Sequence, residues 1–97
     1  MLHIINKSPY DRPALDSALA TGEGAILLIE DGVYAVVKGG AEESKIKGAS
    51  GKFKFYALNV DLDARGIADR VMDGVTVVDY GGFVDLVAEN KTCQSWL

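Results

Sequence analysis

Apolar residues along the chain gather in short runs that are typical of β-strands. Such runs occupy residues 2–6, 25–29 and 75–78, and residues 53–58 form a further strand pattern in which Phe53, Phe55 and Ala57 alternate with Lys54 and Tyr56. Residues 25–29 include no polar position, as expected for a strand that is covered on both faces. Residues 92–97 form a short tail that is long enough for a fifth strand at the edge of the sheet.

The segment after the first strand is predicted to be a helix from the spacing of its apolar residues. Leu15, Ala18 and Leu19 recur at positions i, i+3 and i+4, which is the pattern of one buried helix face. Asp11 is expected to be the N-cap of this helix, with Pro13 in its first turn, where the missing N–H has no cost.

The later segments between strands are also predicted to be helical. A helical pattern covers residues 33–37, and residues 41–51 are expected to form a short exposed helix or a loop. Asn59 is predicted to cap a brief helix that ends at Gly66, and Asp79 to cap the last helix.

Strands that alternate with helices along the whole chain imply βαβ crossovers and a parallel sheet. The predicted fold class is α/β, a small flavodoxin-like or Rossmann-like sandwich of three layers with a mostly parallel sheet of four to five strands. The 97 residues hold no repeat or linker, so residues 1–97 are expected to form a single domain.

Composition narrows the function classes. No apolar run approaches the roughly 20 residues of a membrane span, and no secretory signal is recognisable, so we expect no membrane partner. The net charge of −4 argues against direct nucleic-acid binding, although four lysines cluster within residues 45–54. A single cysteine fits a reducing compartment, so the expected location is the cytoplasm.

Signatures of cofactor and metal chemistry are missing from the sequence. The first strand is not followed by a GxGxxG motif, which weighs against dinucleotide or flavin binding. One histidine and one cysteine are too few for a zinc site. We therefore expect no cofactor and no metal, and we expect His3 to be a structural residue of the first strand rather than a general base.

Three carboxylates, Asp31, Asp61 and Asp79, stand where helices are predicted to begin, and capping is their expected role. In open α/β sheets, however, ligands gather beyond the carboxyl ends of the strands. The candidate binding residues at that edge are Ser8, Glu30, Asp31 and Asn59.

Two further groups of residues are candidates for function. Cys93 is the only thiol and hence the only candidate for sulfur or redox chemistry, although an incidental tail cysteine is the more ordinary interpretation. The aromatic residues Tyr80, Phe83 and Trp96 are expected to form a partner interface, because clustered exposed aromatics mark binding surfaces.

The chain resembles the DsrH/TusB family over nearly its whole length, in segments that keep their order. These segments cover residues 1–3, 6–8, 28–35, 56–66, 78–86 and 94–97. The resemblance implies a subunit of a sulfur-relay complex, in which two sister subunits of the same fold (DsrE/TusD-like and DsrF/TusC-like) join it in a two-two-two heterohexamer. Such complexes take persulfide sulfur from an upstream carrier protein and pass it to a downstream one, for tRNA wobble-uridine 2-thiolation or for sulfur oxidation.

One position departs from part of this family. Some members of the oxidative branch have a cysteine directly after a serine in the first helix, and the matching position here is Ala18, after Ser17. The resemblance therefore implies an accessory subunit, in a complex whose main sulfur-carrying cysteine lies on a sister subunit. Three hypotheses remain. The chain is an accessory subunit for tRNA thiolation or sulfur oxidation, or a persulfide carrier that uses Cys93. The third hypothesis is a homo-oligomeric binder of a small molecule or tRNA that uses the Glu30–Asp31 strand edge or the lysine cluster at residues 45–54.

Overall fold

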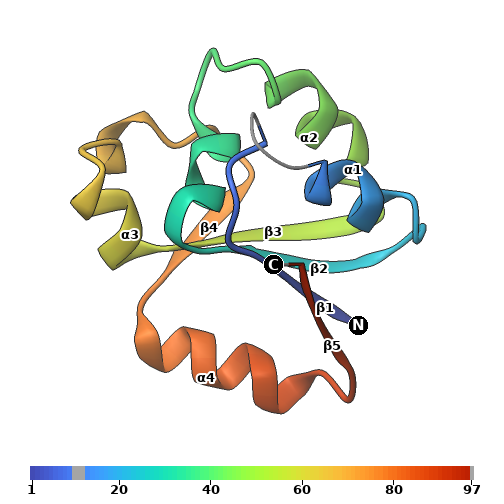
Figure 1. Cartoon of the computed structure of the whole chain (residues 1–97). Helices are drawn as coiled ribbons and strands as arrows, with labels where there is room; N and C mark the ends of the chain where they lie inside the picture. Colours follow the sequence, from blue (N-terminus) through green and yellow to red (C-terminus); the bar gives the residue numbers. More distant parts are fainter. Residues whose placement is uncertain (10–12, 97) are drawn as a thin grey trace.

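The computed structural model describes residues 1–9 and 13–96, and these residues build one five-stranded sheet with helices packed on it (Figure 1). The strands are β1 (Leu2–Ile5), β2 (Gly24–Leu28), β3 (Phe53–Leu58), β4 (Val75–Val78) and β5 (Cys93–Trp96). The helices are α1 (Ala14–Leu19), α2 (Glu43–Ala49), α3 (Asn59–Ala64) and α4 (Tyr80–Glu89), together with the 3₁₀ helices η1 (Glu30–Val36) and η2 (Ala68–Arg70).

The sheet is parallel throughout, with the strand order β4-β3-β2-β1-β5. The chain therefore moves stepwise from β1 to β4 in one direction and then crosses back over the sheet to place β5 beside β1. The predicted α/β class, the parallel sheet and the fifth edge strand are all confirmed.

The two faces of the sheet are covered unequally. Helices α1, α2 and α3 lie on one side of the sheet and α4 lies alone on the other (Figure 1). This arrangement follows from the strand order, because right-handed crossovers that step in one direction put their helices on one face, and the return step uses the other face.

Alternating strand residues supply two separate cores. The larger one packs Ile26, Phe55 and their neighbours against α1, η1, α2 and α3. The smaller one joins Leu2 and Leu27 to Leu86 of α4. Residues of β2 point into both, which confirms that this strand is covered on both faces.

Two of three predicted helix starts differ in detail from the structure, and the third agrees with it. Pro13 occupies the N-cap position of α1 rather than its first turn, and Asp11 lies outside the described residues. Asn59 is the first residue of α3 and not its cap; the cap is Leu58, and no side chain caps this helix. Asp79 does cap α4 as predicted, since its Oδ1 accepts a 2.8 Å hydrogen bond from the Gly82 N–H.

The segment between β2 and β3 also differs in detail from its sequence-based prediction. The helical pattern at 33–37 belongs to the 3₁₀ helix η1, which ends at Val36, while Val37 is extended and bridges to Val71. Residues 43–49 form the helix α2, and its Ile46 is buried in the larger core, so this helix is exposed on one side only. Among the described residues, none of these helices is long and apolar enough to cross a membrane.

Candidate functional site

The carboxyl ends of the parallel strands bring the sequence-predicted binding residues to one edge of the sheet. Ser8 follows β1, Glu30 and Asp31 follow β2, and Asn59 follows β3. Ser8 is buried, Asn59 is half-buried, and both acidic residues are exposed. This edge is where open α/β sheets hold ligands, so the structure places these residues at the expected position.

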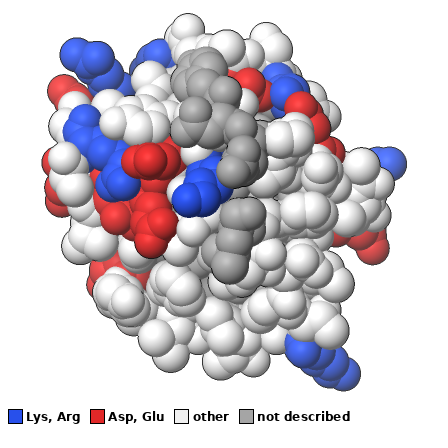
Figure 2. Space-filling model, viewed as in Figure 1, with Lys and Arg blue, Asp and Glu red and all other residues white. Residues whose placement is uncertain are grey.

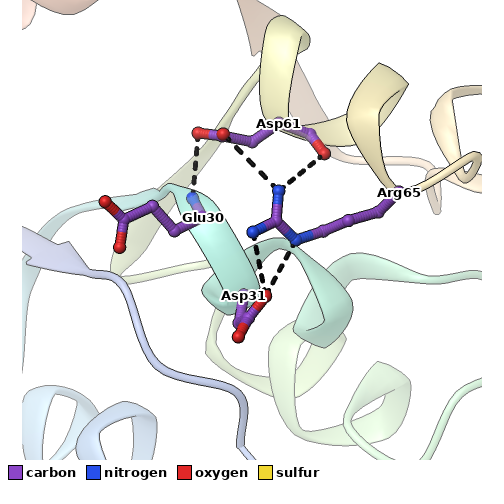
Figure 3. Close-up of polar contacts among 4 residues, drawn as sticks. All are labelled: Glu30, Asp31, Asp61 and Arg65. Carbon is purple, nitrogen blue, oxygen red and sulfur yellow. Dashed lines mark hydrogen bonds and ion pairs between the residues drawn. The ribbon is translucent and has the colours of Figure 1, made fainter.

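An arginine that the sequence analysis did not single out dominates the chemistry of this edge. The guanidinium of Arg65 lies between Asp31 and Asp61 (Figure 3). Its Nε donates a 2.9 Å hydrogen bond to Asp31 Oδ1, and its terminal nitrogens lie 2.9 Å from Asp31 Oδ1 and 3.6 Å from Asp61 Oδ1. The i,i+4 spacing of Asp61 and Arg65 on one helix is the sequence signal that points to this pair.

Glu30 is fixed by its backbone and not by its side chain. Its φ of 49° lies in the left-handed region, and its N–H donates a 2.9 Å hydrogen bond to Asp61 Oδ2. Asp61 therefore caps the start of η1 from the neighbouring helix α3. The carboxylate of Glu30 points away from the guanidinium (Figure 3).

These contacts define what the edge can do. Both carboxylates that face Arg65 neutralise its charge, so the cluster ties η1 to α3. Among the described residues, no three His, Cys, Asp or Glu side chains converge as metal ligands. The cluster is a structural bridge.

Replacing Arg65 with alanine is expected to lower the free energy of unfolding by about 1 kcal/mol, because the pairs are partly solvent-exposed and one carboxylate then lacks its partner. Urea denaturation measures this change. Arg70→Ala is the matched control, since the Arg70 side chain pairs with no described residue, and we expect no more than a few tenths of a kcal/mol from it. Equal effects of the two variants contradict the bridge.

The roles of Asp31 and Asn59 at this edge differ from the expected capping. Asp31 caps no helix and pairs with Arg65 instead. The side chain of Asn59 also has a different place. Its Oδ1 is buried and has no hydrogen-bond partner among the described residues. It lines a hollow of about 390 Å³ with Val77, Val78, Asp79 and Gly82, where the ends of β3 and β4 meet the start of α4. The residue thus faces the start of a different helix from the one it was predicted to cap.

Cys93 lies at the opposite edge of the sheet. It is the first residue of β5 and stands in register with Leu2, the first residue of β1, so it is about 10 Å of strand away from the carboxyl ends. The side chain is exposed, and no described residue donates a hydrogen bond to its sulfur. Cys93 is therefore neither at a helix N-terminus nor near the carboxylate edge, and nothing described there activates the thiol.

The position that corresponds to the family cysteine lies in the core. Ala18 has no exposed surface and packs in the larger hydrophobic cluster. Its carbonyl oxygen accepts a 2.7 Å hydrogen bond from the Thr21 hydroxyl at the end of α1. An alanine methyl carries no sulfur, and this position in the present chain serves packing.

His3 is buried and hydrogen-bonded through both ring nitrogens. Trp96 Nε1 donates to His3 Nδ1 at 3.1 Å, and Thr21 Oγ1 lies 3.3 Å from His3 Nε2. Because the Thr21 hydroxyl already donates to Ala18, its oxygen accepts from Nε2–H, which fixes the neutral Nε2–H tautomer. Burial first, and then the nearby α-amino group of Met1, lower the pKa of His3. The expected structural role of His3 is confirmed.

The three aromatic residues predicted as one interface lie on two faces of the sheet. Tyr80 and Phe83 stack on α4 with ring centroids 5.7 Å apart, and Phe83 packs against the smaller core. Trp96 packs against the larger core on the other face and binds His3. The sequence-based grouping of Trp96 with the other two is wrong, because β5 turns this ring inward to the histidine.

Comparisons with known proteins agree on a family. The model of the family described as DsrH like protein matches residues 7–93. Protein TusB of Escherichia coli O1:K1 is 37% identical over 98 residues, covering 99% of this chain and 100% of the relative, and Protein TusB of Shigella flexneri is 36% identical over the same length. The chain belongs to the DsrH/TusB family.

Solved structures agree on the fold. The crystal structure of the ychN protein from E. coli is similar with a TM-score of 0.79 and 16% identity, covering 98% of this chain and 97% of that one. A protein of unknown function, MTH1491 from Methanobacterium thermoautotrophicum, is similar with a TM-score of 0.77 and 20% identity, covering 98% and 96%. At these identities the likeness concerns the fold alone.

Proposed function

We propose that this chain is an accessory subunit of a cytoplasmic sulfur relay that passes persulfide sulfur toward the 2-thiolation of wobble uridine in tRNA. In this proposal it joins two sister subunits of the same fold in a two-two-two complex and contributes binding surface. Upstream and downstream carrier proteins deliver and receive the sulfur, and cysteines of the sister subunits hold it.

The full-length similarity to TusB, together with a buried alanine at the family cysteine position, carries the proposal. A subunit that carried sulfur needs an accessible thiol whose pKa is lowered by a helix N-terminus or by nearby cations. Cys93 is accessible, but it lies in an edge strand with no described hydrogen bond to its sulfur. The arrangement favours a role in assembly over a role in chemistry.

Cys93→Ser is expected to leave sulfur transfer unchanged. The experiment expresses the wild-type chain or the variant in cells that lack their own TusB and measures 2-thiouridine in tRNA by mass spectrometry. We expect equal restoration by both chains, because serine is nearly isosteric and the thiol is not used.

Two other outcomes of this experiment would contradict the proposal, each in a different way. Restoration by the wild-type chain and none by Cys93→Ser makes Cys93 the persulfide carrier and contradicts the accessory role. Failure of both chains contradicts the proposal for tRNA and favours the second candidate, the equivalent subunit of a sulfur-oxidation complex. The sequence segments 80–86 and 94–97 resemble the sulfur-oxidation branch of the family more closely than the tRNA branch. This resemblance is the reason to keep sulfur oxidation as the second candidate.

A further inference from the structure

Exposed apolar side chains concentrate in one part of the molecule. Among the described residues, seven large apolar side chains are exposed, and four of them fall between positions 77 and 87. They are Val77, Tyr80, Val84 and Val87, with 46%, 67%, 59% and 40% of their surface exposed. We call these four residues the valine surface.

The valine surface follows from the pattern of α4. Tyr80, Val84 and Val87 stand at positions i, i+4 and i+7, which form one stripe along a helix. The stripe that faces the sheet is a different one and includes Phe83 and Leu86. The helix α4 is therefore apolar on two sides, whereas a helix that packs on one sheet and otherwise meets water needs only one apolar stripe.

Val77 extends this stripe beyond the helix. It lies on β4, the edge strand of the sheet, and lines the same hollow as Gly82 in the first turn of α4. The strand β4 carries no lysine, proline or described bulge, which are the usual protections of an edge that stays in water. Around α4, the lower part of Figure 2 shows mostly uncharged surface, while charged side chains gather in the upper half.

The charged residues in the segment that contains β4 and α4 are all acidic. Residues 71–90 hold four acidic residues and no Lys or Arg, so the other ten acidic residues of the chain match its ten basic ones and the net charge of −4 belongs to this segment. Glu89 shares a hollow with Lys52 and Lys54 at the far end of α4, which leaves Asp73, Asp79 and Asp85 as the unbalanced acids.

From these observations we infer that the valine surface binds a protein whose contact face is apolar and basic, and that this protein is not a second copy of the chain. Two copies that met through α4 would bring their acidic residues together, which is unfavourable at an interface. The inference rests on the proposed function, in which the occupant is a sister subunit of the same fold, and it adds the surface and the chemistry of the partner.

The test measures binding of this chain to the two sister subunits of the complex, purified after co-expression. Tyr80→Ala and Val84→Asp are each expected to weaken binding about tenfold or more, because truncated aromatics and buried charges at an interface centre have large effects. Tyr34→Ala is the matched control, since Tyr34 is also exposed but lies on η1, and it is expected to bind like the wild-type chain.

A second variant tests the charge. Asp85→Lys is expected to slow association and to reduce its dependence on salt, while Glu23→Lys, an exposed residue between α1 and β2, leaves both unchanged. Thermal unfolding followed by circular dichroism verifies that each variant is folded, and Asp85 and Val84 are exposed, so their replacement spares the core.

The outcomes separate the surface from the function. If the wild-type chain binds and all variants bind equally well, the surface assignment is wrong while the proposed function stands. If the wild-type chain does not bind the sister subunits, the proposed function fails and the inference with it. Self-association of the wild-type chain that Tyr80→Ala abolishes overturns the inference that the partner is a different protein.

Discussion

Gly32→Ala is expected to lower the free energy of unfolding by about 3 kcal/mol, because a methyl group at this position meets backbone and not a movable side chain. Gly32 is buried in η1, and a Cβ on it would overlap the carbonyl oxygen of Ile5 and lie 3.0 Å from its carbonyl carbon. The Ile5 carbonyl cannot shift freely, since it accepts a 3.0 Å hydrogen bond from the Ile29 N–H.

The control for this substitution is Gly48→Ala, which is expected to raise the free energy of unfolding by about 0.5–1 kcal/mol. Gly48 lies within α2, has open space where a Cβ would stand, and costs helix stability relative to alanine. Urea denaturation of both variants measures the two effects. Similar values for the two variants contradict the described packing of η1 on the end of β1.

Trp96→Phe is expected to lower the free energy of unfolding by about 2 kcal/mol, because it keeps an aromatic ring and removes the indole N–H that satisfies His3 Nδ1. A buried acceptor without a donor costs more than the lost bond itself. Gln94→Ala in the same strand is the control, since Gln94 is exposed and only its own neighbour Ser95 accepts from it. An effect of Trp96→Phe no larger than that of Gln94→Ala contradicts the anchoring role.

The same histidine predicts how stability depends on pH. The pKa of His3 is lowered in the folded chain, so below the unfolded value of about 6.5 the unfolded chain binds a proton before the folded chain does. Stability is therefore fully present above that value and decreases as the pH falls toward the folded pKa. His3 is the only histidine, so denaturation between pH 5 and 7 reports on it, and a flat profile contradicts its burial as a neutral ring.

Carboxylates affect the stability of the fold at a lower pH than His3 does. The hydrogen bond from the Gly39 N–H, and then that from Lys47, lower the pKa of Glu43, so its contribution is also lost on acidification. This loss begins near the unfolded pKa of a glutamate, about 4.3, and leaves the histidine window clear.

The parts of the fold that depend on local sequence could be predicted. The first four strands follow from their apolar residues, and Asp79 could be identified as a cap because the N–H that it binds belongs to Gly82, three residues along the chain. The same local reasoning failed for Asn59, whose helix begins one residue earlier than predicted.

Contacts between distant residues could not be predicted in this way. Trp96 and His3 are separated by 93 positions, and they meet only because the strand order puts β5 beside β1. The pairing of Arg65 with Asp31 depends likewise on how α3 packs against η1. For the candidate site, the sequence indicated which edge of the sheet to examine, and the structure revealed that an arginine bridge occupies it.

Native mass spectrometry of the chain, co-expressed with its two sister subunits and loaded by a persulfide donor, tests the central claim most directly. The account predicts a two-two-two assembly that contains this chain, with the added sulfur mass on a sister subunit and none on this one. Recovery of the chain alone or only with itself, or added sulfur on Cys93, would contradict the account.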